Sequence, residues 1–305
     1  MKPVVFIHTN DFQMLGAKLS KHSLERGSRH ADRFEVRYLR YEEQPQLTGR
    51  VGQNYLRRRG KWVTWNDGNP QSFTPLRFLP PQAMGFQGRA LVIDPDVFAV
   101  GDVWPLLDRD MAGKALMCRR VEKPGTRPFL ASSVMLLDCE KLRHWRWDEQ
   151  IEEMFQGRRP YRPWINLELE PEENIGTFEA RWNDLDHLDD STVLLHFTRR
   201  LTQPWKTGLP LGAVEEGKTA SKGRTWIDRL LGREPKHRRN PDPRQERFFF
   251  ELLADALEAG VVSGEELSRE VSDRNVRPDV FEVLARYSPP PREAGVPIGS
   301  APRSA

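Results

Sequence analysis

The sequence has few cysteines and no long hydrophobic run. Its 305 residues include two cysteines, Cys118 and Cys139, both in or beside apolar segments. This number excludes a disulfide framework and a cysteine-ligated metal cluster, and it favours the reducing cytosol. No segment approaches the roughly 18 apolar residues of a membrane span. Because Met1-Lys2-Pro3 leads directly into an apolar strand pattern, we expect no signal peptide and predict a cytoplasmic protein.

The chain also has little net charge. Its 47 lysines and arginines nearly balance 44 aspartates and glutamates, so the net charge is only +3 and we expect no nucleic-acid partner. The positive charge is local, because residues 216–240 contain eight basic and three acidic residues. A basic linker of this kind either contacts anionic lipid peripherally, at the inner face of the membrane, or is a solvated connection.

What the sequence does contain is the pattern of an α/β domain. Val4–Ile7 is an apolar run typical of a buried strand, and a helical pattern follows it to about Arg26. Phe34, Val36 and Tyr38 alternate with polar residues, as in a half-exposed strand. We expect further strands at residues 90–93, 114–118, 133–137 and 192–197. The succession of strand, helix and strand predicts an α/β fold.

The composition changes after residue 215. Asp242 and Pro243 are helix start signals, and Gly260 is a stop signal. Ser263 and Glu266 have the spacing of a capping box. The last residues are mostly Pro, Gly, Ser and Ala, with little to bury. We therefore predict a main domain at 1–215, a basic flexible linker at 216–241, a small helical unit at 242–288 and a disordered tail at 289–305.

Two aspartates follow the apolar run Ala90–Ile93. Asp94 and Asp96 are one residue apart, so both carboxylates can face one hard cation, which offsets the cost of bringing like charges together. This arrangement is typical of phosphate chemistry. Phosphatases of the haloacid dehalogenase type share the Asp-x-Asp pattern, but they have Thr or Val two residues after the second Asp, where this chain has Phe98. A purely structural alternative is that the aspartates cap the strand end.

Four segments, in order along the chain, add to this motif. They are Val5–Asp11, Thr74–Pro81, Leu91–Phe98, and the closing pair Leu195–Thr198 with Gln203–Lys206. Together they resemble glycosyltransferase family 8 and, more broadly, nucleotide-sugar transferases of the GT-A fold. The resemblance covers roughly residues 4–208. It implies a GT-A-type fold, a Rossmann-like mixed sheet flanked by helices, with the C-terminal helices as a small appendage.

The resemblance also implies a metal site and a donor site. Asp96 and His196 would bind a divalent cation, and Asp94 would share the ion or bridge to the ribose. Carboxylate, imidazole and phosphate ligands favour Mn²⁺ over Mg²⁺, because imidazole is the softer ligand. The donor-binding residues that it implies are Thr9, Asp11, Arg77, Asp94, Ser132, Arg199 and Lys206.

The chain departs from the family pattern in three places. In the closing motif, Arg199 and Gln203 stand where the family has Gly and Lys. In the sugar pocket, Ala131–Ser133 replaces Asn-x-Gly. The usual Asp-Gln pair is missing, and Asn166 and Glu168 are the candidates for the catalytic residue that faces the anomeric carbon.

The motifs predict a metal-dependent glycosyltransferase that moves a hexose from a UDP-sugar to a glycan, a lipid-linked sugar or a protein. Retention of configuration is implied by the resemblance alone. Because the closing motif is altered, a weak or inactive nucleotide-sugar-binding protein is the alternative. Thr9 and Asp11 have a second interpretation as helix caps. We interpret Arg57-Arg58-Arg59 as a solvated face, and Trp62 and Trp65 as core or rim residues with stacking on a sugar as the alternative.

Overall fold

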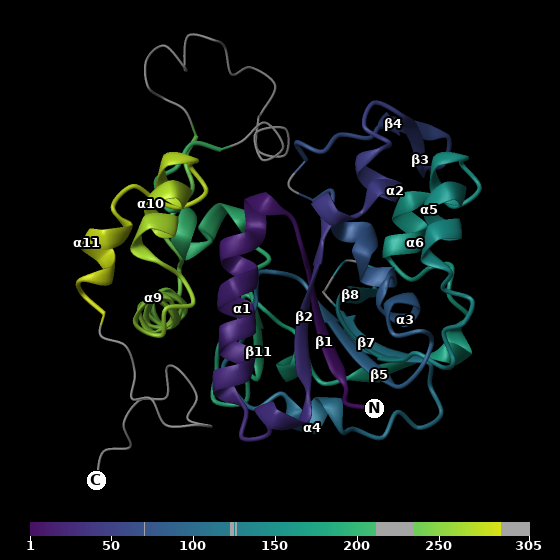
Figure 1. The fold of residues 1–305 in the computed structure, drawn as a ribbon, viewed down its shortest axis with the longest axis horizontal. Helices are drawn as coiled ribbons and strands as arrows, with labels where there is room; N and C mark the ends of the chain where they lie inside the picture. Colours follow the sequence, from purple (N-terminus) through teal and green to yellow (C-terminus); the bar gives the residue numbers. More distant parts are fainter. Residues whose placement is uncertain (70, 123–124, 126, 212–234, 288–305) are drawn as a thin grey trace.

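The computed structural model describes residues 1–69, 71–122, 125, 127–211 and 235–287. Its centre is a six-stranded mixed sheet with the order β2-β1-β5-β8-β7-β9 (Figure 1). The strands are β1 (Val4–Thr9), β2 (Glu35–Arg40), β5 (Arg89–Ile93), β7 (Leu116–Val121), β8 (Phe129–Asp138) and β9 (Ile175–Phe178). β1 is parallel to β2 and β5, whereas β8 is antiparallel to both of its neighbours. The predicted α/β class with a mixed sheet is confirmed.

Both faces of this sheet are buried. Since successive side chains of a strand point to opposite faces, one strand contributes residues to an apolar cluster on each side. Val4 and Phe6 belong to one apolar cluster, and Val5 and Ile7 belong to another. The first cluster contains residues of α2 (Pro45–Thr48), α5 (Trp147–Phe155) and α6 (Tyr161–Ile165). The second contains residues of α1 (Met14–Gly27) and α4 (Trp104–Leu107). The sheet is therefore the middle layer of the domain.

Smaller elements surround the end of β5. β6 (Val97–Ala99), β10 (Asp184–Leu185) and β11 (Leu194–His196) form a three-stranded sheet. β3 (Asn54–Arg58) and β4 (Lys61–Thr64) form a hairpin, and α3 (Pro80–Ala83) precedes β5. β11 is antiparallel to β6, with His196 opposite Val97. This register places the end of β11 beside the residues that follow β5.

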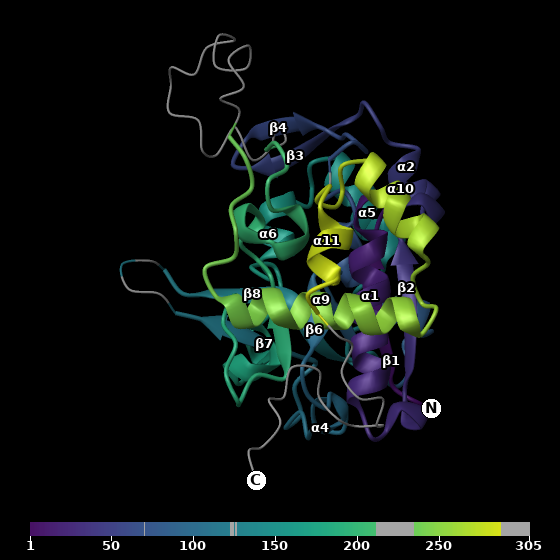
Figure 2. The same ribbon diagram turned by 90° about the vertical axis from the view of Figure 1, so that its left-hand side faces the viewer.

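The C-terminal helices pack on the α/β domain. They are α9 (Pro243–Glu258), α10 (Gly264–Ser272) and α11 (Val280–Leu284), and α9 lies across α1 (Figure 2). Phe249 of α9 stacks on Trp205, with ring centroids 4.7 Å apart. The buried Asp255 accepts hydrogen bonds from His22 and Arg26 of α1 at 2.6 and 2.7 Å. The helices and the α/β domain therefore share one apolar cluster and a buried charge contact.

The helix start signals of the C-terminal unit are confirmed. Asp242 accepts a hydrogen bond from the backbone N–H of Arg244, and Ser263 accepts one from the backbone N–H of Glu266. The cap interpretation of Thr9 and Asp11 is wrong. α1 begins after the 3-10 turn Asp11–Gln13, and neither that turn nor α1 has a side-chain cap.

Two of the predicted segments fall outside the described residues, namely most of the linker (216–234) and the whole tail (289–305). Across the described ranges, none of the helices combines the length and apolar character that a membrane span requires.

Candidate active site

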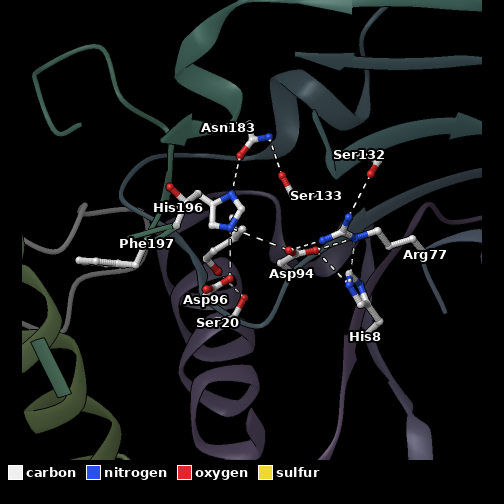
Figure 3. A network of polar contacts seen from close by, with 12 residues as sticks. His8, Ser20, Arg77, Asp94, Asp96, Ser132, Ser133, Asn183, His196 and Phe197 are labelled. Atoms are coloured by element: carbon white, nitrogen blue, oxygen red, sulfur yellow. Dashed lines mark hydrogen bonds and ion pairs between the residues drawn. The ribbon is translucent and has the colours of Figure 1, made fainter. Parts of the chain in front are cut away.

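Three side chains with metal-ligand chemistry meet where β5 and β11 end. Asp94 and Asp96 follow β5, and His196 is the last residue of β11. His196 Nε2 lies 3.2 Å from Asp96 Oδ1 and 3.9 Å from Asp94 Oδ2 (Figure 3). One ligand atom from each residue lies within 4.8 Å of the others. Residues about a hundred positions apart in the chain therefore form one candidate metal centre, which is what the sequence motifs predict.

The orientation of His196 is fixed by Asn183. His196 Nδ1 lies 2.9 Å from Asn183 Oδ1, and Asn183 Nδ2 donates to Ser133 Oγ at 3.0 Å. With Nδ1–H donated to an amide oxygen, Nε2 faces the two carboxylates. Burial lowers the pKa of His196, but the carboxylates of Asp96 and Asp94 outweigh it and raise the pKa above its ordinary value. The position between these side chains thus favours positive charge, and the oxygen and nitrogen donors suit a divalent cation.

Asp94 is held as a carboxylate by two cationic or polar neighbours. Arg77 donates to both of its oxygens, from Nε at 3.0 Å and from Nη2 at 2.5 Å. His8 Nε2 lies 3.0 Å from Asp94 Oδ1, since β1 and β5 are parallel and end at the same edge of the sheet. Burial raises the pKa of Asp94, but the Arg77 guanidinium and the His8 imidazole hold it well below its usual range. Asp94 is therefore a preformed anion.

The remaining contacts connect this centre to its surroundings. Arg77 Nη1 donates to Ser132 Oγ at 3.0 Å (Figure 3). Ser132 in turn donates to the carbonyl of Ile165 at 2.6 Å. Gln203 Nε2 donates to Asp96 Oδ2 at 3.2 Å and to the carbonyl of Phe197 at 3.0 Å. Gln203 of the closing motif therefore supplies a hydrogen-bond donor that orients Asp96.

The centre opens into a cleft of about 820 Å³. Seven of the predicted site residues line this cleft, namely Arg77, Asp94, Asp96, Ser132, Asn166, His196 and Lys206. The cleft also contains aromatic and polar side chains from the β3–β4 hairpin and from α6. It is large enough for a ligand the size of a nucleotide sugar.

Four other predicted residues lie outside the described lining of the cleft. Thr9 is buried and donates to the carbonyl of Asn10 at 3.2 Å. Asp11 is ion-paired with Arg40 at 2.6 Å. Glu168 accepts a hydrogen bond from Asn166 at 3.1 Å, and Arg199 lies 3.8 Å from Asp186. Their roles in donor binding and catalysis stay predictions.

Several residues of the site were not predicted as such. His8 lies in the segment Val5–Asp11, and Asn183 lies upstream of the closing motif. Their contacts depend on the register of β1 with β5 and on the path of the chain before β11. Arg57, interpreted as part of a solvated face, lines the cleft together with Arg162. Trp65 is buried and lines the cleft, whereas Trp62 is half exposed.

No protein-family model matches the sequence, and the search of curated proteins finds no relative. Among solved structures, the chain is similar to the glycosyltransferase GlyE of Streptococcus pneumoniae TIGR4, with 14% identity and a TM-score of 0.48. The match covers 79% of this chain and 66% of GlyE, so the chain spans just under two thirds of that protein.

Two further solved structures are similar to the chain. The galactosyltransferase LgtC, in complex with donor and acceptor sugar analogues, has 16% identity and a TM-score of 0.44, over 74% of this chain and 99% of LgtC. Mouse xyloside xylosyltransferase 1 has 13% identity and a TM-score of 0.42, over 65% of this chain and 98% of that protein. These neighbours are glycosyltransferases. The mixed α/β sheet flanked by helices that the motifs predict is the architecture observed.

Proposed function

We propose that this chain is a divalent-cation-dependent glycosyltransferase, similar to family 8, that takes a hexose from a UDP-sugar with retention of configuration. The observation that carries the proposal is the meeting of Asp94, Asp96 and His196 at one point of a large cleft. Each of the three is held in place by a neighbour, respectively Arg77, Gln203 and Asn183. A side-chain set fixed in this way is preorganised for a ligand.

The ligand atoms of Asp94, Asp96 and His196 fit Mn²⁺ or Mg²⁺, and the imidazole of His196 favours Mn²⁺. A bound cation would act as a Lewis acid for the diphosphate that leaves as the glycosidic bond of the donor breaks. The chain's own cations, Arg200 and Lys206, line the same cleft and supply further positive charge for that leaving group. Ser132 and Asn166 line the part of the cleft that we assign to the sugar.

The acceptor is a glycan, a lipid-linked sugar or a protein, and we propose that the transfer takes place in the cytosol. Both cysteines are buried and free, as expected for a reducing compartment. The phosphatase alternative requires an aspartate that is available as nucleophile. Here both oxygens of Asp94 accept hydrogen bonds from Arg77, so the geometry favours the transferase.

The test is thermal stabilisation by sugar nucleotides with and without Mn²⁺. UDP-glucose and UDP-galactose should each raise the melting temperature only when Mn²⁺ is present, because a ligand that binds the native state stabilises it by mass action, about 2.7 kcal/mol at 100 times its dissociation constant. Asp96→Ala should remove the shift. Asp108→Ala, a change to an exposed aspartate outside the cleft, should leave it intact.

A second measurement separates a transferase from a binding protein. A transferase releases UDP from its donor slowly, by transfer to water, whereas a pure binding protein retains the intact UDP-sugar. Absence of any shift with either nucleotide would refute both. A shift without UDP release would leave only the binding protein.

A further inference from the structure

More basic than acidic side chains line the cleft. Five of its lining residues are basic, namely Arg57, Arg77, Arg162, Arg200 and Lys206. The only carboxylates among the described lining residues are Asp94 and Asp96. Asp94 is already neutralised by Arg77. Arg200 and Lys206 each have a partner in the protein. The charges that remain to be accounted for are those of Arg57 and Arg162.

Arg57 and Arg162 belong to elements that carry none of the metal-ligand candidates. Arg57 is in β3 and Arg162 is in α6, and these elements lie together on one side of the molecule (Figure 1). Arg200 and Lys206 follow β11, in the segment that packs through Trp205 against α9 on the other side. Arg57 and Arg162 therefore enter the cleft from elements other than those that carry Arg200 and Lys206.

The two arginines converge on one tyrosine. Tyr161, which precedes Arg162, packs edge-on against Tyr55 with ring centroids 5.4 Å apart, and both rings line the cleft. Burial raises the pKa of Tyr161, while a hydrogen bond with Thr74 and the positive charges of Arg77, Arg162 and Arg57 act in the opposite direction. Both guanidinium groups are therefore close to the same hydroxyl, although they come from different elements.

Neighbouring arginines have partners that these two lack. Arg50 is ion-paired with Glu152, and Arg159 with Glu153 at 2.9 Å. By contrast, no hydrogen bond or ion pair joins Arg57 or Arg162 to any residue in the described ranges, although both are half-buried. Two nearby cations without counterions repel each other and lose hydration, so an anion between them would stabilise both.

We propose that Arg57 and Arg162 form a second anion subsite, which holds a carboxylate or phosphate group of a substrate apart from the donor diphosphate. This inference rests on the proposed function. The anionic group belongs either to the transferred sugar, as in a uronic acid, or to the acceptor. The Tyr55 and Tyr161 rings, which line the same part of the cleft, would pack against the sugar that carries it.

The experiment compares the native chain with the variants Arg57→Gln and Arg162→Gln and their combination. Arg58→Gln is the matched control, because Arg58 is on the same hairpin, exposed and not part of the lining. The donor arm measures the dissociation constants of UDP-glucuronate and UDP-glucose in Mn²⁺. The acceptor arm measures binding of glucuronate, glucose 6-phosphate and glucose to the protein saturated with Mn²⁺ and UDP.

A uronic-acid donor predicts that UDP-glucuronate binds about tenfold or more tightly than UDP-glucose, since charged hydrogen bonds contribute on this scale. An anionic acceptor predicts that the two nucleotides bind alike, while glucuronate or glucose 6-phosphate binds and glucose does not. In either case the double variant should lose the preference and the control should retain it. No preference for the anionic probe in either arm, or a preference that survives in the double variant, would overturn the subsite.

Failure of the proposed function gives a different result. If UDP itself does not bind in Mn²⁺, the transferase proposal fails, and the subsite is then decided by titration with inorganic phosphate and glucuronate alone. Binding that the double variant weakens tenfold supports the subsite, and binding that is absent or unchanged overturns it.

Discussion

The arginines that line the cleft differ in whether they have partners within the protein. Arg77 is bonded to Asp94 through two nitrogens and to Ser132 through a third. By contrast, Arg57 and Arg162 have no such partner in the described part of the chain. The difference shows that position in the cleft alone does not define a residue's role. A paired arginine stabilises the fold and orients a ligand group, whereas an unpaired one is available to a ligand.

Of the variants that test this contrast, we expect Arg77→Gln to have the largest effect on stability. The change leaves the carboxylate of Asp94 without its main counterion in a nearly buried position, and breaking such a pair costs about 3–5 kcal/mol. The free energy of unfolding, measured by urea denaturation, should fall by this amount.

The control for Arg77→Gln is Arg109→Gln. Arg109 also forms two hydrogen bonds to one carboxylate, that of Glu179, but the pair is much more exposed. Exposed ion pairs contribute about 0–1 kcal/mol, so the control should lose little. Equal losses in the two variants would show that the buried Arg77–Asp94 pair stabilises the fold no more than an exposed pair does.

An intermediate effect is expected for Asn183→Ala. Asn183 fixes the ring of His196 and is not among the candidate ligands, and loss of such a supporting hydrogen bond typically weakens metal binding about 10- to 100-fold. Titration with Mn²⁺ by calorimetry measures this change. Asn174→Ala, which removes a 2.7 Å amide hydrogen bond to Glu170 away from the cleft, should leave Mn²⁺ affinity unchanged. The orienting role of Asn183 is wrong if both variants bind Mn²⁺ like the native chain.

The smallest effect is expected for Arg57→Gln on stability. Because Arg57 has no ion pair in the described ranges, its removal should change the free energy of unfolding by less than about 0.5 kcal/mol. Urea denaturation beside Arg77→Gln gives the direct comparison. A loss of more than 2 kcal/mol would mean that Arg57 has a structural partner. The contrast between the paired Arg77 and an unpaired Arg57 would then be wrong.

Part of this arrangement is predictable from the sequence. The apolar runs of β1 and β5 and the Asp-x-Asp motif predict a strand end with two carboxylates, and the closing motif adds His196. Their meeting depends on the antiparallel pairing of β6 and β11. Apolar periodicity thus predicts the strands of the sheet, whereas the metal centre is predicted only through the family resemblance.

The supporting contacts are not predictable in the same way. His8 reaches Asp94 because of a strand register, and Gln203 reaches Asp96 because of the turn after β11. The β3–β4 hairpin lies in a polar segment without clear periodicity, so the sequence gives no indication that Arg57 faces the cleft while Arg58 is exposed. Side-chain direction in such segments depends on tertiary packing, which local pattern does not encode.

The stack of Trp205 on Phe249 has a consequence for motion. Trp205 follows Gln203, which is bonded to Asp96, and Phe249 is fixed in the long helix α9. Any opening of the segment after β11 to release a product must therefore either carry α9 along or separate the two rings. On the proposed function, the C-terminal helices would thus take part in any opening of the cleft that releases product.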